Sequence, residues 1–252
     1  MKKITAILAT VIGLFLASSA SAQTPSTFLV PNPQTARWSY VETDANGKTV
    51  ATQYHSVASL EGNGINGSLK INVEEVSATS PTETLKSFIF YRFKDGEYMF
   101  DMNAVFERDV LDTFVSSAIE EEGEEEVSAE ELKSALEKIR SEFVISGEIR
   151  GIPRYPKVGD LPDFEFQFKF SILNMKVNGE DRRVVGTEKV ATKAGTFDCF
   201  ILEETVTTKA MMMKDVERTK TWYAYGIGMV KEITYDKHGK VMSTLVLDSI
   251  NW

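Results

Sequence analysis

The side chains with the greatest capacity for chemistry are one cysteine and two histidines, Cys199, His55 and His238. A reactive thiol needs a cation, a helix N-terminus or a histidine base that favours the thiolate. Cys199 lies in the strand-like stretch "KAGTFDCFILEETV", beside Asp198 and shortly before two glutamates, so its neighbours raise the pKa of the thiol. One cysteine cannot form a disulfide within the chain, whereas pairing between chains stays open at this point. We predict that Cys199 is a buried, unreactive packing residue.

The motifs predict neither a metal site nor a cofactor. Zinc sites need clusters such as C-x-x-C or H-E-x-x-H, and two distant histidines with one cysteine supply none. The run Glu120–Glu126 differs from a calcium loop because contiguous glutamate side chains diverge; a solvated loop is the simpler interpretation, and cation binding there stays open. The sequence has no nucleophile elbow and no phosphate-binding loop. We therefore predict a protein that is not an enzyme, with hydrolase as the least favoured class.

The first 22 residues have the zones of a secretory signal peptide. Lys2 and Lys3 precede the apolar run Ile4–Ala17, and Ala20-Ser21-Ala22 fits a cleavage site. The run is shorter than the roughly 20 residues of a membrane-spanning helix. A lipoprotein needs a cysteine directly at the cleavage point, and the only cysteine of this chain, Cys199, lies far away. We predict cleavage after Ala22, which leaves a soluble domain over residues 23–252 in the periplasm or outside the cell.

The charge of the chain argues against nucleic acid and anionic membranes as general partners. The net charge is −9, and it becomes −11 when the two lysines of the signal peptide are removed. The remaining length suits a single β-rich domain that can bury a core without cross-links.

Turn signals and alternation predict about eleven antiparallel strands. A strand over 164–172 has the clearest pattern, with every second side chain apolar. Further strands are expected over 67–76 and 197–208. Tight hairpins are expected at four Gly-containing sites, since these residues tolerate the positive φ that such turns need: Asn46-Gly47, Asp95-Gly96, Asn178-Gly179 and Gly239.

The middle of the chain predicts a helical insertion over about 104–143. Apolar residues recur at helical spacing over 104–122, and "SAEE" at Ser128 offers a capping box for a second helix that ends near Phe143. Two apolar helix stripes need a partner, and the apolar face of the 164–172 strand is available. We therefore expect two helices packed on the sheet face that carries Phe164, Phe166, Phe168 and Phe170.

Three stretches of the sequence can be compared with a known family: "YPKVGDLPD", "TEKVATKAGTFDCFILEETV" and "TWYAYGIGMVKEITYDKHGKVMSTLVL". They resemble the TapB-like exported proteins of Gram-negative envelopes, a family of largely uncharacterised function. The resemblance covers roughly 155–250, and 36–76 more loosely. It implies a curved antiparallel sheet, an open half-barrel like that of the periplasmic lipoprotein carriers (LolA/LolB-like), with helices on the concave face. It also implies that Cys199 belongs to a strand motif in which Gly195 forms a turn and Phe197 is a packing residue.

Two functions are compatible with these features. The first is an envelope protein that binds a hydrophobic or lipid-like ligand in the groove between curved sheet and helices. The second is an adaptor that binds another envelope protein through a sheet edge or through the methionines of "KAMMMKD". The candidate binding residues are Phe164, Phe166, Phe168, Phe170, Met211, Met212 and Met213.

Overall fold

The computed structural model describes residues 30–31, 35–62, 65–105, 134, 137, 141–170 and 173–252. These residues form a 14-stranded antiparallel sheet and a short helix, α2 (Met102–Val105). The strands are β1 (Arg37–Asp44), β2 (Thr49–Gly62), β3 (Gly67–Ser77), β4 (Thr84–Lys94), β5 (Glu97–Phe100), β6 (Phe143–Gly147), β7 (Ile149–Pro153), β8 (Gly159–Asp160), β9 (Phe164–Phe170), β10 (Leu173–Thr192), β11 (Gly195–Ala210), β12 (Met213–Ala224), β13 (Gly228–Asp236) and β14 (Val241–Asn251).

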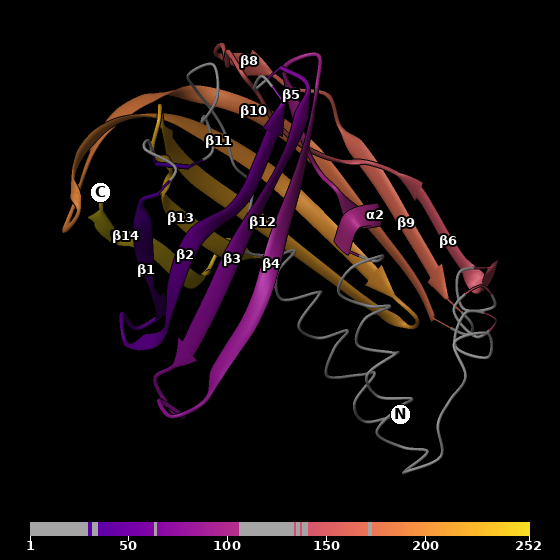
Figure 1. Ribbon diagram of the computed structural model, residues 1–252, viewed down its shortest axis with the longest axis horizontal. Helices are drawn as coiled ribbons and strands as arrows, with labels where there is room; N and C mark the ends of the chain where they lie inside the picture. The colour runs from indigo at the N-terminus through magenta and orange to yellow at the C-terminus, as the bar shows by residue number, and fades with distance from the viewer. Residues whose placement is uncertain are drawn as a thin grey trace.

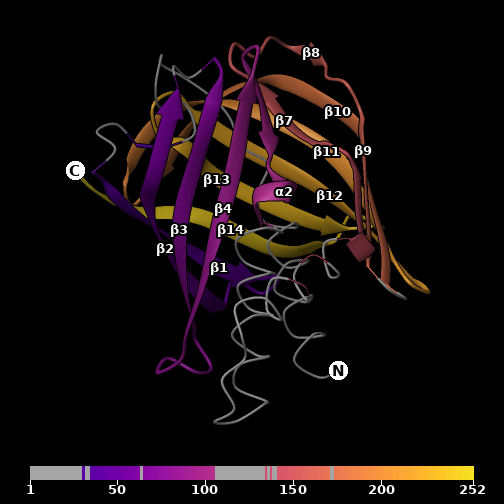
Figure 2. The ribbon, with the colours of Figure 1, turned by 45° about the vertical axis from the view of Figure 1, so that its right-hand side comes forward.

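The sheet is strongly curved and nearly closed. Strands β2–β4 form one wall and β10–β13 the opposite wall, with α2 between them (Figures 1 and 2). Its order is β6-β9-β10-β11-β12-β13-β14-β1-β2-β3-β4-β5-β7, and β8 pairs with β10 outside this path. The expectation of an open half-barrel of about eleven strands is therefore corrected. The strands that the sequence did not reveal include β6, β7 and β8, which are too short to show a periodic pattern.

The two ends of the strand order are covalent neighbours, because only Glu148 separates β6 from β7. β6 pairs with β9, whereas β7 pairs with β5, so this single segment runs from one end of the sheet to the other. Gly147 makes the bend with a φ of 78°, and a Cβ there would collide with the carbonyl oxygen of Glu165. We call segment 143–153 the seam of the sheet.

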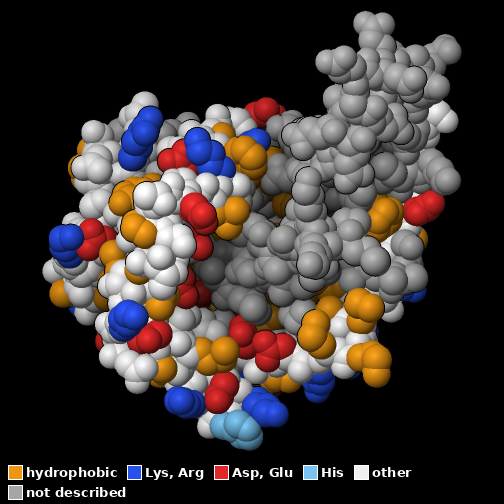
Figure 3. Space-filling view, turned by 90° about the horizontal axis from the view of Figure 1, so that it is seen from below, with side chains coloured by type: hydrophobic (Ala, Val, Ile, Leu, Met, Phe, Trp, Pro, Cys, Tyr) orange, Lys and Arg blue, Asp and Glu red, His pale blue; other side chains and the backbone are white. Residues whose placement is uncertain are grey.

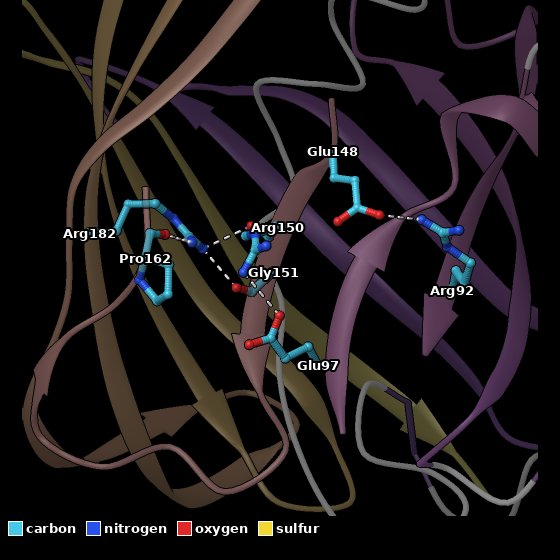
Figure 4. Close-up of polar contacts among 7 residues, drawn as sticks. All are labelled: Arg92, Glu97, Glu148, Arg150, Gly151, Pro162 and Arg182. Carbon is cyan, nitrogen blue, oxygen red and sulfur yellow. Dashed lines mark hydrogen bonds and ion pairs between the residues drawn. The ribbon is translucent and has the colours of Figure 1, made fainter. Parts of the chain in front are cut away.

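Polar side chains hold the seam on both sides (Figure 4). Arg92 of β4 donates to Glu148 over 2.7 Å, and Arg150 of β7 donates to Glu97 over 3.2 Å. Both ion pairs are partly exposed, so each contributes at most about 1 kcal/mol to the free energy of unfolding.

A buried arginine, Arg182, makes the strongest contacts to the seam. The register of β10 against β11 shifts between Glu180 and Arg183, and Asp181 has a φ of 55°, which marks a bulge. The bulge places the Arg182 guanidinium against β7: Nη2 donates to the carbonyl oxygens of Arg150 (2.8 Å) and Gly151 (2.7 Å). Nη1 donates to the carbonyl of Pro162 (2.7 Å) and Nε to the Glu204 carboxylate (2.8 Å).

Three of the four expected hairpins are confirmed. Turns lie at Asn46-Gly47 between β1 and β2, at Asp95-Gly96 between β4 and β5, and at Gly239 between β13 and β14. The hairpin expected at Asn178-Gly179 is wrong, because β10 continues through it and pairs with β9 and β11 on its two sides. The ring of Phe164 lies where a Cβ of Gly179 would be, so the glycine serves aromatic packing.

The main core lies inside the curved sheet and joins its two walls. Leu69 and Ile71 of β3 belong to the same buried cluster as Leu202 of β11, Tyr223 of β12 and Leu247 of β14. The long helices expected over 104–122 and 128–143 fall mostly outside the described residues. Phe143, the expected end of the second helix, is instead the first residue of β6.

Candidate functional site

One side of the inner surface is apolar and aromatic. Every second residue of β9 faces inward: Phe164 and Phe166 are buried, and Phe168 and Phe170 are half-buried. The pattern "FEFQFKF" sorts these side chains because successive strand residues point to opposite faces. The expected apolar face is thus confirmed, and Met102 of α2 packs against it.

Neighbouring strands extend this apolar surface. Phe143 of β6 stacks on Phe170, with ring centroids 4.0 Å apart, and lies 5.3 Å from the ring of Phe168. On the other side, Phe166 pairs with Val177 of β10 and Phe168 with Met175. The apolar wall therefore spans β6, β9 and β10 and reaches Ala210 of β11.

The same inner face becomes polar at the next strands. Val177 pairs with Thr208 of β11, and Thr208 lies diagonally opposite Glu217 of β12, which is followed on that face by Thr219. All three are buried; Glu217 is 4% exposed. Within the described residues, the Thr208 hydroxyl, the Thr219 hydroxyl and Oε2 of Glu217 form no hydrogen bond. We call these three residues the polar row.

The polar row carries a carboxyl group whose pKa lies near neutral pH. Burial is the main cause that raises the pKa of Glu217 to about 7, and the charge of Asp215 adds to it. Asp236 of β13 pairs with Glu217 in the sheet register and is a further acidic neighbour. Buried polar atoms are normally hydrogen-bonded, so three unpartnered ones on one face are an unusual group.

More acids follow on the same inner surface. Burial, together with the charge of Glu75, raises the pKa of Glu42 on β1, and a hydrogen bond to Ser243 offsets part of the effect. Gln53 donates to Glu75 over 3.2 Å. Seen from below, several acidic side chains lie on the described part of the surface, among hydrophobic and basic ones (Figure 3). The inner surface thus carries acids on β1, β3 and β12 in addition to the apolar wall of β9 and β10.

The two histidines lie in different settings. His55, expected beside a strand start, lies within β2 and is buried against the rings of Trp38 and Tyr40. Burial lowers the pKa of His55 to about 3, so its ring is neutral. His238 lies in the β13–β14 turn, as expected.

Cys199 is buried, with 1% of its surface exposed, and its Sγ donates to the carbonyl of Phe197 over 3.6 Å. It belongs to a cluster with Ile201 and Trp222. Burial, followed by the charges of Asp198 and Glu188, raises the pKa of the thiol to about 12. The expected packing role is consistent with each of these features.

Cys199 is therefore expected to resist a thiol reagent in the native protein and to react fully in denaturant, because the thiol is inaccessible and protonated. Cys199→Ala should lower the free energy of unfolding by about 1–2 kcal/mol through lost packing. Thiol titration and urea unfolding measure both effects. Rapid labelling of the native protein, or a dimer on a non-reducing gel, would contradict this expectation.

In the described part of the chain, no three His, Cys, Asp or Glu residues lie together as a metal site. The run Glu120–Glu126, where cation binding was considered, lies outside the described residues. No helix among the described segments is long and apolar enough to cross a bilayer.

The three candidate methionines lie together at the β11–β12 hairpin and are exposed. Met211, Met212 and Met213 are 64%, 99% and 72% exposed, respectively. Met213 pairs with Ala210, a member of the apolar wall, so the hairpin end adjoins the inner surface. We call Met211–Met213 the methionine tip.

The structure thus places the phenylalanines of β9 on one inner wall and the methionine tip at its margin. Sequence reasoning missed the polar row and Arg182. In "VERTKTWY", both alternating faces contain polar residues, so the pattern does not tell which face is buried. The only signal for the row was the repeated threonine at every second position.

Comparison with known proteins identifies the fold. Residues 159–247 match the DUF3108-like family. This match overlaps the region on which the resemblance to TapB-like proteins was placed but carries a different family description, so the finer resemblance stays a prediction. No curated protein matches the chain significantly.

Two solved structures share the fold over most of the chain. A protein from Parabacteroides distasonis, described as a lipoprotein, is 16% identical with a TM-score of 0.60, and the alignment covers 91% of this chain and 100% of that one. A protein from Bacteroides fragilis, described as exported and as having a YmcC-like fold, is 18% identical with a TM-score of 0.58, over 90% and 100% of the two chains. The chain therefore shares the fold that is described for the B. fragilis protein as YmcC-like.

Proposed function

We propose that this chain is an exported envelope protein that binds a lipid-like ligand on the inner surface of its curved sheet and catalyses no reaction. Export is supported by the signal-like residues 1–22. It is also supported by the two proteins of the same fold, which are described as a lipoprotein and as an exported protein.

The observation that carries the ligand proposal is the change from apolar to unpartnered polar groups across neighbouring strands. Phe166, Val177 and Thr208 follow one another from β9 to β11, and Glu217 lies diagonally beyond. Ligand sites combine a largely apolar lining with a few placed polar groups. An amphiphile can lie with its hydrocarbon chain on the β9–β10 wall and its head at the polar row.

The polar row favours a head that donates hydrogen bonds. The free atoms there are a carboxyl oxygen and two threonine hydroxyls, and Asp215 and Asp236 add negative charge beside Glu217. An amine or hydroxyl head can donate to these oxygens, whereas a carboxylate or phosphate head meets like charge. The ligand class is therefore an amphiphile with an amino or hydroxyl head.

A naphthylamine dye that fluoresces in apolar sites tests the proposal. The dye should bind the wild-type protein and be displaced by dodecylamine and dodecanol at least about tenfold more effectively than by dodecanoate. Phe168→Asp should weaken dye binding by about tenfold or more, because it puts a charge on the apolar wall. Phe88→Asp is the matched control, since Phe88 is half-buried under Lys70 on the other face of the sheet.

The two parts of the proposal fail in different ways. Absence of dye binding by the folded wild-type protein would reject the ligand site itself. Equal displacement by the amine and by the carboxylate would reject the assignment of the head and leave the apolar wall in place.

A further inference from the structure

We propose that the methionine tip docks on a lipid surface that carries anionic headgroups. This inference is independent of the ligand on the inner surface. Met212 is 99% exposed, and its two neighbours are also mostly exposed, which places three consecutive apolar side chains in water. Surface apolar residues are ordinary when scattered, whereas a contiguous group at a protruding hairpin marks an interaction site.

The backbone holds the tip in place. Met211 has a φ of 55°, a conformation that is uncommon for a residue with a side chain. Its N–H donates to the carbonyl of Asn174 in β10 over 3.1 Å, which ties the turn to the neighbouring strand. Figures 1 and 2 show the lower ends of β11 and β12 at the margin of the sheet. The fold thus holds the methionine tip in a defined, exposed position.

The charges beside the tip identify the kind of surface. Lys209 and Lys214 flank the methionines and lie directly opposite each other in the sheet, and both are exposed. Among the described residues, neither forms an ion pair. Directly opposed like charges destabilise a strand pair, so an anion that lies between them would remove this repulsion. Lys176 of β10 continues the row beside Lys209, although it is already paired with Glu165.

A lipid surface satisfies the apolar tip and the lysines together. Thioether side chains insert at the boundary of the acyl chains, and lysines behind them reach the phosphate level, which is the two-part binding that a peripheral protein needs. Asp215 is the one acid next to Lys214 in the sequence and weakens the local positive charge. The net charge of −9 opposes general attraction to anionic lipids, so contact must be confined to this tip.

Co-sedimentation with vesicles tests the docking. The protein should bind phosphatidylcholine vesicles that contain about 30% phosphatidylglycerol about tenfold better than pure phosphatidylcholine vesicles, and salt should reduce the difference. Met212→Asp should weaken binding to both kinds by about tenfold, because it removes the inserted side chain. Met242→Asp is the control, since Met242 is also an exposed methionine, 44%, but lies on β14.

A paired charge reversal separates the role of the lysines from that of net charge. Lys209→Glu/Lys214→Glu should abolish the preference for anionic vesicles, whereas Lys94→Glu/Lys157→Glu, which changes net charge equally at exposed positions elsewhere, should preserve it. The proposal would be overturned if Met212→Asp left vesicle binding unchanged, or if the wild-type protein bound neither the anionic nor the pure phosphatidylcholine vesicles.

A fluorescent label at Met212→Cys distinguishes a lipid surface from a protein partner, because native Cys199 is buried. The emission maximum of the label should shift to shorter wavelength when anionic vesicles are added. A shift that requires an added envelope protein, with none on vesicles, would assign the tip to that protein and overturn membrane docking.

Discussion

Replacement of Arg182 by methionine is expected to lower the free energy of unfolding by about 3–5 kcal/mol. The side chains of Arg182 and Glu204 are 1% and 4% exposed, so the substitution leaves a carboxylate in the interior without its partner. It also removes the donors to the carbonyls of Arg150, Gly151 and Pro162. Each buried group that loses its hydrogen bond adds a desolvation penalty.

The adjacent arginine supplies a matched control. Arg183 pairs with Glu203 over 3.3 Å, but its side chain is 57% exposed, so Arg183→Met should cost less than about 1 kcal/mol. Urea unfolding of both variants at neutral pH measures the difference. The double variant Arg182→Met/Glu204→Leu should recover part of the loss, because it removes the isolated charge. Similar midpoints for the two single variants would show that Arg182 does not hold the seam.

The seam explains why Arg182 has so large an expected effect. β6 and β7 connect the ends of the sheet through short strands that pair with β9 and β5. Arg182 reaches the seam from β10, and its guanidinium lies 5.0 Å from the centre of the Phe164 ring on β9. Loss of this side chain therefore affects both the closure of the sheet and the apolar wall of the candidate site.

Local sequence predicted the features that depend on neighbouring residues. The alternation in 164–170 predicted the face of β9, and Asn46-Gly47 predicted a turn, because strand geometry and positive φ are local properties. The turn predicted at Asn178-Gly179 was wrong because strand pairing on both sides of β10 outweighs the local turn preference. Glycine there is needed for the Phe164 ring, which comes from another strand.

Closure and the polar row depend on contacts between distant residues. Nothing in "EDRRVV" distinguishes Arg182 from Arg183; a bulge turns one into the interior and leaves the other in solvent. Likewise Glu217 and Arg218 are both charged, and only the register of β12 against β11 and β13 shows that Glu217 faces inward. The candidate site was thus predictable on its apolar side, whereas its polar side needed the structure.

Glu217→Gln is expected to stabilise the protein at alkaline pH and to have little effect in acid. The folded state raises the pKa of Glu217 from 4.5 to about 7, so folding favours the protonated carboxyl. Below pH 4.5 the group is protonated in both states, and its ionisation costs nothing. Between pH 4.5 and 7 the unfolded chain releases the proton first, which lowers the stability of the fold, and above pH 7 the penalty is constant.

Since one pKa unit corresponds to about 1.4 kcal/mol, the variant should gain about 1–3 kcal/mol over wild type at pH 8 and almost nothing at pH 4. Urea unfolding at several pH values measures this difference, and Glu61→Gln, at an exposed position of β2, is the control that should follow wild type. The same substitution should weaken displacement of the dye by dodecylamine above pH 7, because a neutral amide cannot pair with an ammonium head. Parallel stability profiles of Glu217→Gln and wild type would show that Glu217 ionises freely and that the polar row is open to water. If the variant gains stability at pH 8 but binds dodecylamine as tightly as wild type, Glu217 is a buried carboxyl, but the head of the ligand lies elsewhere.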